Sequence, residues 1–242
     1  MKIKVLYEDS NILAIDKPSG ISVHPSTAQV DGKDKQNFIT DWVLKNYPKM
    51  KNVGEPMGEV KRPGVVHRLD HETSGVMILA KNQKAYEALK KQFADREVKK
   101  IYVAIVSGFV NPPAGGDRGI INKPIGRSPK DFRRHLAGRG ARGEMRDAVT
   151  EYKVLKRFIS GKNKYTYLEV KPKTGRTHQI RVHMKFLNHP VACDTLYNPS
   201  GFSPKGISRL ALHAKSIEFK NLKGEIIKVE SPLPKEFVKV VK

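Results

Sequence analysis

A short polar segment between two apolar runs is the strongest constraint on how this chain folds. The residues from Gly64 to Gly75 read GVVHRLDHETSG, and the apolar run VMILA follows at 76–80. The apolar residues on both sides are typical of short buried strands, so the polar residues must form a tight connection at a strand edge. Such a connection holds its side chains rigidly, and Asp70 lies within it. From these residues alone, a functional site and a polar loop with capping residues are equally good interpretations.

The charge balance indicates a polyanionic partner. The 242 residues include 46 Lys and Arg against 24 Asp and Glu, a formal net charge of +22. A protein this basic repels its own copies and is attracted to nucleic acid. A membrane surface is the competing partner, but the N-terminus shows neither a basic amphipathic helix nor a lipidation signal. We therefore expect a monomer that binds nucleic acid.

The cysteine content and the absence of long apolar runs predict the compartment. Cys193 is the only cysteine, so no internal disulfide can form. No apolar run approaches the length of a membrane span, and no export signal opens the chain. These features favour a cytoplasmic protein.

The spacing of apolar residues predicts an α+β fold with a mostly antiparallel central sheet flanked by helices. Strand-like segments with turn-sized links outnumber the helices. Helical spacing occurs at 38–47, after Asn82 and after Thr177, with these two residues as expected N-caps, and a short helix is expected after Pro234. We expect one catalytic domain over 1–242, made of two abutting halves.

Residues 112–147 differ in kind from the rest of the chain. Between Arg118 and Arg146 there are nine Lys or Arg against Asp131 and Glu144. The run lies between two strand-like segments, which predicts a hairpin-like extension rather than a tail. A charged run is usually a solvated face, but we favour an arm that contacts the phosphate backbone of a nucleic acid. The arginines expected to make these contacts are Arg127, Arg133, Arg134, Arg139 and Arg142.

Several kinds of chemistry are excluded because their patterns are missing. His67 and His71 do not form an H-E-x-x-H motif and no cysteine pair exists, so no metal site is predicted. The chain has no Walker-type G-K-[ST] and no nucleophile elbow. What remains is a rigidly placed Asp70 in a protein suited to nucleic acid. A lone carboxylate without metal suggests attack at a glycosidic carbon or at an activated base.

Five motifs in order resemble those of the RluA-type pseudouridine synthase family. The central one is His67-Arg-Leu-Asp70 with Thr-Ser-Gly75 and the apolar run after it. The others are Lys17-Pro-Ser-Gly20, Lys100-Ile-Tyr102, Thr174-Gly-Arg-Thr-His-Gln-Ile-Arg181 and Arg209-Leu-Ala-Leu-His213. Together they cover nearly the whole chain, although the segment 30–61 matches no pattern of the family. The small N-terminal RNA-binding domain of many members has no counterpart here, so a stand-alone catalytic domain is expected.

The resemblance implies the pseudouridine synthase fold and the isomerisation of a specific uridine in structured RNA, with no cofactor and no metal. Asp70 would be the nucleophile, Tyr102 would stack on the target base, and Arg209 would keep Asp70 ionised. Arg68 would fill the space left by the flipped uridine. The other implied substrate-binding residues are His67, Leu69, Arg176, Thr177, His178, Gln179, Arg181 and Leu210, of which the arginines at 176 and 181 are expected at the surface in contact with phosphate.

The RNA target and the role of the scaffold stay open at this point. Ribosomal RNA is preferred over tRNA, and attack at the ribose or at the base cannot be distinguished. A non-catalytic RNA-binding or ribosome-assembly protein on the same scaffold is the main alternative, and it would not need Asp70. A glycosylase is a weaker alternative, which would release free uracil.

Overall fold

The computed structural model describes residues 2–25, 38–58, 60–138 and 140–241, and it divides the chain into two compact units. Unit 1 comprises Met1–Lys99 and Ala214–Pro232, and unit 2 comprises Lys100–His213 and Leu233–Lys242. The chain passes from one unit to the other three times. Neither unit is therefore a continuous stretch of sequence.

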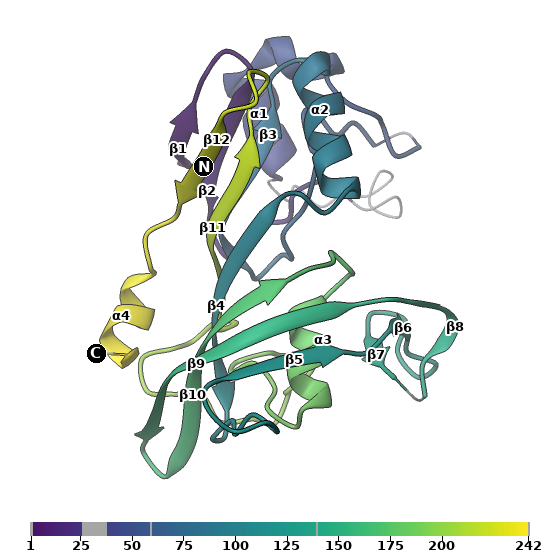
Figure 1. The fold of residues 1–242 in the computed structure, drawn as a ribbon. Coiled ribbons are helices and arrows are strands. Elements are labelled where there is room, and N and C mark those ends of the chain that lie inside the picture. Colours follow the sequence, from purple (N-terminus) through teal and green to yellow (C-terminus); the bar gives the residue numbers. More distant parts are fainter. Residues whose placement is uncertain (1, 26–37, 59, 139, 242) are drawn as a thin grey trace. The chain divides into compact units, whose positions relative to one another are not determined.

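Unit 1 is built on a sheet with the strand order β1-β2-β3-β11, and β12 pairs with β11 (Figure 1). The pairs β1–β2, β2–β3 and β11–β12 are antiparallel. Every residue of β3 is buried, which explains why this strand is a continuous apolar run. The strands are β1 Lys4–Glu8, β2 Ile12–Lys17, β3 Ser74–Ala80, β11 Leu212–Lys220 and β12 Ile226–Glu230.

The two α-helices of unit 1 lie where the apolar spacing predicts them, and a 3₁₀ helix that was not predicted follows the first. They are α1 Ile39–Asn46, the 3₁₀ helix η2 Pro48–Asn52, and α2 Gln83–Ala94, which packs against β3. Asn82 caps α2 as predicted, because its side-chain oxygen accepts a hydrogen bond from the Ala85 N–H at 3.0 Å. The two valines before the Asp70 loop do not form a full strand, since Val65 makes only an isolated bridge to Leu79.

Unit 2 contains a main sheet in the order β4-β10-β9-β5 and a small sheet in the order β7-β6-β8. All of these pairs are antiparallel. The main strands are β4 Lys99–Ser107, β5 Arg118–Asn122, β9 Val149–Ser160 and β10 Asn163–Pro172, and the small ones are β6 Ile125–Arg127, β7 His135–Ala137 and β8 Arg142–Arg146.

The predicted extension at 112–147 is therefore not a single element. Its segment 118–122 is β5, paired with β9 in the main sheet, and only 125–146 forms the small sheet. The reason β5 escapes sequence patterning is that only one of its residues, Ile121, is buried. A strand with one buried side chain carries almost no apolar signal.

Two helices complete unit 2, α3 Gln179–Phe186 and α4 Lys235–Val241. The predicted N-cap Thr177 is wrong: the cap position is His178, in the left-handed region at φ 54°. The side-chain oxygen of Gln179 instead reaches back and accepts from the Arg176 N–H at 3.0 Å and from the Thr174 hydroxyl at 2.6 Å. The side chain of the first residue of α3 thus holds the segment that leads into the helix. The predicted α+β class with a mostly antiparallel sheet is confirmed.

Candidate active site

Asp70 lies in an ordered loop of unit 1 just before β3. The Thr73 N–H closes this loop on the carbonyl of Asp70 at 3.1 Å. The side chain of Asp70 is half-buried, while its neighbour Leu69 is only 4% exposed and Arg68 is exposed. Leu69 therefore anchors the loop in the apolar interior, which leaves Arg68 available at the surface next to the candidate nucleophile.

His67 connects the Asp70 loop to β3 and α2. Its Nε2 accepts a hydrogen bond from the Ile78 N–H of β3 at 3.0 Å, and its ring stacks on Phe93 of α2 with centroids 4.8 Å apart. Gly64 allows the loop to approach β3, because a Cβ at this position would lie 2.3 Å from the carbonyl oxygen of Ala80. These contacts assign His67 a positioning role.

Lys17 joins the first motif to the Asp70 loop. Its side chain is fully buried, and its ammonium donates to the carbonyls of Pro18, Ile21 and His71 at 2.8, 2.7 and 3.1 Å. The same His71 carbonyl also accepts from the Gly20 N–H at 2.9 Å. Buried charges persist in proteins only where their hydrogen bonds are supplied. Lys17 thus ties two distant segments around the candidate nucleophile, and sequence reasoning assigned it no role.

Tyr102 belongs to β4 of unit 2, where it is half-buried beside the core. Lys100 is two residues earlier, so both side chains project from the same face of the strand. Burial lowers the pKa of the Lys100 ammonium. A Cβ added to Gly175 would lie 3.8 Å from the Nζ of Lys100, so Gly175 is close to this ammonium group. The motif Lys100-Ile-Tyr102 therefore places a cation next to the aromatic ring that is expected to hold the base.

The late motif of unit 2 is held by the C-terminal helix. The Nε and Nη2 of Arg209 each lie 2.8 Å from Oε1 of Glu236 in α4, and the guanidinium lies over the ring of Phe237 at 5.5 Å. Glu236 was not considered in the sequence reasoning and is the carboxylate that pairs with Arg209 within unit 2. Leu210 is fully buried in the core of unit 2, and its contact with substrate stays a prediction.

The motif 174–181 is mostly turned inward. Gln179 is buried. Its side-chain amide also donates to the Val149 carbonyl and to the Thr150 hydroxyl at the start of β9, each at 3.0 Å. Arg181 binds Asp194 through two hydrogen bonds of 2.7 and 2.8 Å, with both side chains almost fully buried. The expected surface exposure of Arg181 is therefore wrong. The periodicity of a short helix could not reveal a carboxylate buried beneath it.

His178 links this motif to the small sheet through Tyr197. The Nδ1 of His178 lies 3.0 Å from the Tyr197 hydroxyl, which also accepts from the His135 N–H of β7 at 2.9 Å. The same tyrosine belongs to a satellite core with Ile125 of β6 and Val182 of α3. The base of the small sheet is thus fixed to α3.

A hollow of about 500 Å³ lies on the small sheet, and four arginines line it. Arg127 and Arg142, which are predicted to contact the RNA backbone, line it together with Arg176 and Thr177, which are predicted to bind substrate. Arg146 and His135 also line it, and the sequence reasoning missed both. The spacing of charges along the chain does not show which strands will pair, so it could not group these side chains.

The other arginines predicted to contact the RNA backbone lie elsewhere. Arg133 pairs with Asp131 through contacts of 3.1 and 3.0 Å, and Arg134 approaches the same carboxylate at 3.5 Å. The hydrogen bond from Arg133 holds the pKa of the Asp131 carboxyl below its usual value. Arg139 lies outside the described residues. The predicted backbone contacts therefore divide into arginines of the hollow and arginines held by Asp131.

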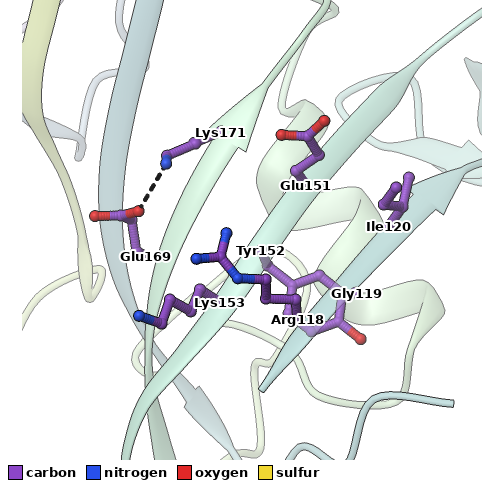
Figure 2. A pocket seen from close by; sticks show the side chains of 8 residues that line it. All are labelled: Arg118, Gly119, Ile120, Glu151, Tyr152, Lys153, Glu169 and Lys171. Atoms are coloured by element: carbon purple, nitrogen blue, oxygen red, sulfur yellow. Dashed lines mark ion pairs between the residues drawn. The ribbon is translucent and has the colours of Figure 1, made fainter. Parts of the chain in front are cut away.

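A second hollow of about 270 Å³ lies over β5, β9 and β10. Figure 2 shows that its lining carries both signs of charge, with Glu151 and Glu169 beside Arg118, Lys153 and Lys171. Glu169 pairs with Lys171 at 3.0 Å. Two carboxylates in the wall oppose the approach of a phosphate, so this hollow does not extend the basic surface.

Comparison with known proteins decides the family. The family model for RNA pseudouridylate synthase matches residues 11–186, which include the Asp70 loop, Tyr102 and the motif 174–181. The chain belongs to the RNA pseudouridylate synthase family. It is accordingly an isomerase that acts on uridine in RNA, and this part of the sequence prediction is confirmed.

Relatives match this synthase over nearly all of its length. It is 39% identical over 237 residues, covering 98% of this chain and 67% of the relative, to the ribosomal large subunit pseudouridine synthase D of Borreliella burgdorferi. It is 38% identical to the protein of the same name from Xanthomonas campestris, covering 99% of this chain and 68% of that relative. Among solved structures, human RNA Pseudouridylate Synthase Domain Containing 4 is similar with a TM-score of 0.70 and 27% identity, covering 98% and 91% of the two chains. The pseudouridine synthase fold is thus confirmed.

Two further findings concern the described part of this synthase. None of its described helices is long and apolar enough to cross a membrane. Among the same residues, no three His, Cys, Asp or Glu side chains gather in a way that would hold a metal ion.

Proposed function

We propose that this synthase converts a uridine of large-subunit ribosomal RNA into pseudouridine, with Asp70 as the nucleophile. The observation that carries the proposal is the ordered loop in which Leu69 is buried, Asp70 is half-buried and Lys17 binds the carbonyl of the next residue, His71. Two relatives that match nearly the whole chain are named as large-subunit enzymes, which supports ribosomal RNA over tRNA.

In the proposed reaction the carboxylate of Asp70 adds covalently to the ribose or to the uracil, and the bond between N1 and the anomeric carbon breaks. The uracil turns, C5 bonds to the anomeric carbon and the bond to Asp70 breaks, which frees the carboxylate. The C5 proton leaves and N1 gains a proton. Tyr102 stacks on the base, Arg209 is the proposed cation that keeps Asp70 ionised, and Arg68 fills the stack vacated by the uridine. Extruding a base costs on the order of a few kcal/mol, which contacts with the rest of the RNA must offset.

The test compares Asp70→Asn with Glu72→Gln, a change of the same kind two positions along the loop. Asn keeps the shape of Asp70 but is not a nucleophile, so pseudouridine formation should fall by at least about a thousandfold. Glu72→Gln should keep wild-type activity. Pseudouridine is measured in transcribed fragments of large-subunit RNA and, in parallel, in tRNA.

The outcomes separate the proposal from its alternatives. Equal product from wild type and Asp70→Asn would remove Asp70 as the nucleophile. RNA binding without product on any RNA would favour a binding or assembly protein, and free uracil would indicate a glycosylase. Product in tRNA alone would move the target away from the ribosome.

We also propose that the synthase acts as a monomer in the cytoplasm. The net charge of +22 disfavours self-association, and the single cysteine offers no internal disulfide. Light scattering on the purified protein tests the first part, and fractionation of cells tests the second. A dimer mass, or recovery outside the cytoplasm, would contradict it.

A further inference from the structure

The proposed reaction assigns no chemical step to the arginine-lined hollow of unit 2. The hollow lies on the small sheet, and the pairing of the strands decides which side chains line it. Arg127 of β6 is paired directly with His135 of β7 on one side and with Arg142 of β8 on the other. Directly paired residues project to the same face, and like charges in such a pair destabilise a sheet. The register thus holds two guanidinium groups side by side at a cost to stability.

Little within the protein neutralises these groups. Arg146 pairs with Glu144 at 3.0 Å, which is the one carboxylate among the residues of the lining. Arg176 uses its Nε to donate to the backbone carbonyl of Asp147 at 3.0 Å. In the part of the chain that the structure describes, Arg127 and Arg142 form no ion pair. The hollow therefore presents a net excess of fixed positive charge.

The walls of the hollow are preorganised. The small sheet is fixed to α3 through Tyr197, which binds the N–H of His135 and packs in the satellite core. On the other wall, the Arg176 N–H is held by the side chain of Gln179. Gly126 lets β6 and β8 close up, since a Cβ there would lie 2.5 Å from the sulfur of Met145. Rigid donors lose little conformational freedom when an anion binds.

We propose that this hollow binds one nucleotide of the RNA substrate, with its phosphodiester groups between Arg127, Arg142 and Arg176. Guanidinium groups bind phosphate through two parallel hydrogen bonds, and the exposed side chains of Arg127 and Arg142 can reach a bound strand. The volume of about 500 Å³ is in the range of sites that enclose whole small molecules, so it also admits the sugar and base. The inference rests on the proposed action on RNA and adds a second attachment point for the strand, in unit 2.

The first test is the double variant Arg127→Gln with Arg142→Gln. Its charge-matched control is Lys162→Gln with Lys205→Gln, two exposed lysines of unit 2 outside the hollow. Binding of a labelled stem-loop RNA with a single-stranded uridine loop is measured over a range of salt concentrations. The arginine variant should bind about tenfold more weakly and lose about 1.4 from its salt slope, because each single-strand phosphate contact contributes about 0.7. The control should stay within about twofold of wild type.

A second test uses two single variants, which should change RNA binding in opposite directions. A merely structural role for these residues would not predict this difference. Arg142→Gln should leave the melting temperature of the free protein unchanged or higher, because it relieves the repulsion from Arg127, while RNA binding weakens. Glu144→Gln should strengthen RNA binding and increase the salt slope, because it removes the carboxylate that competes with phosphate. A lower melting temperature for Arg142→Gln, or weaker binding for Glu144→Gln, would overturn the proposal.

The experiment also separates this inference from the proposed function. Wild-type affinity and salt slope in the Arg127→Gln, Arg142→Gln variant would overturn the nucleotide site, whether or not pseudouridine forms. Loss of binding in that variant would support the site even if the wild type yields no pseudouridine on the same RNA. Equal competition by polyglutamate and by an RNA oligonucleotide of the same charge would show general anion attraction and overturn the nucleotide assignment.

Discussion

At the scale of single residues, the arrangement around Asp70 depends on a lysine that never reaches the surface. Lys17 is fully buried at the end of β2, and its ammonium binds three backbone carbonyls, one of them in the Asp70 loop 54 residues away. An apolar run that ends in Lys-Pro shows a turn in the sequence, but it does not show which carbonyls the lysine will meet. The long-range partner is decided by the pairing of β2 with β3.

Lys17→Met should lower the free energy of unfolding by about 3 kcal/mol, because it removes the three hydrogen bonds that the buried ammonium makes. Urea unfolding followed by circular dichroism measures the effect. Lys4→Met, at an exposed lysine of β1, is the control and should change stability by less than about 0.5 kcal/mol. Unfolding of Lys17→Met at the same urea concentration as wild type would show that the three hydrogen bonds add nothing to stability.

At the scale of elements, a buried hydrogen-bond chain joins α3 to β9 and to the segment leading into the small sheet. The Nε2 of His183 must donate to the carbonyl of Lys123 at 3.0 Å, since a carbonyl oxygen only accepts. Its Nδ1 therefore accepts from the Thr150 hydroxyl at 2.8 Å, and that hydroxyl accepts from the side-chain amide of Gln179. A proton on Nδ1 would remove the acceptor of the buried Thr150 hydroxyl proton. Burial lowers the pKa of His183 accordingly.

This lowered pKa predicts loss of stability in weak acid. Below about pH 6.5 His183 binds a proton in the unfolded chain but not in the folded protein. Stability therefore falls as the pH drops from about 6.5 towards the lowered pKa of the folded state. His24 in unit 1, whose pKa is also lowered by burial, acts in the same direction. Urea unfolding at about pH 7.5 and about pH 5.5 should therefore show a smaller difference for His183→Gln than for wild type. Identical differences in the two proteins would refute the role given to His183.

These elements also show what the sequence could predict. The helix after Asn82, the loop before β3 and the β9–β10 hairpin follow from local patterns of apolar, capping and turn residues. The cap position of α3 at His178 and the pairing of β5 do not, because His178 contacts Tyr197, Gln179 contacts Thr150 and β5 pairs with β9, all distant in the sequence. The same holds for the candidate site: the motifs identify Asp70 and Tyr102, whereas the pairing of Arg209 with Glu236 is a tertiary contact.

At the scale of the whole molecule, the positive charge is distributed very unevenly. Unit 2 holds 25 Lys and Arg against 8 Asp and Glu, whereas unit 1 holds 21 against 16. Most of the net charge of +22 thus belongs to the unit that carries the small sheet and its hollow, while the candidate nucleophile belongs to the other. Attraction of RNA and attack on uridine are assigned to different parts of the chain.

The division of charge predicts a steep salt dependence that arises in unit 2. With about six phosphate contacts and a single-strand slope of about 0.7 per contact, a rise from about 50 to about 200 mM salt should weaken RNA binding several hundred-fold. Neutralising three exposed lysines of α2 in unit 1, by Lys84→Gln, Lys90→Gln and Lys91→Gln, should leave the slope nearly unchanged, although it removes more charge than the Arg127→Gln, Arg142→Gln variant. Fluorescence anisotropy with one labelled RNA measures all three proteins. An affinity that ignores salt, or an equal loss of slope in the α2 variant, would show that the attraction does not come from unit 2.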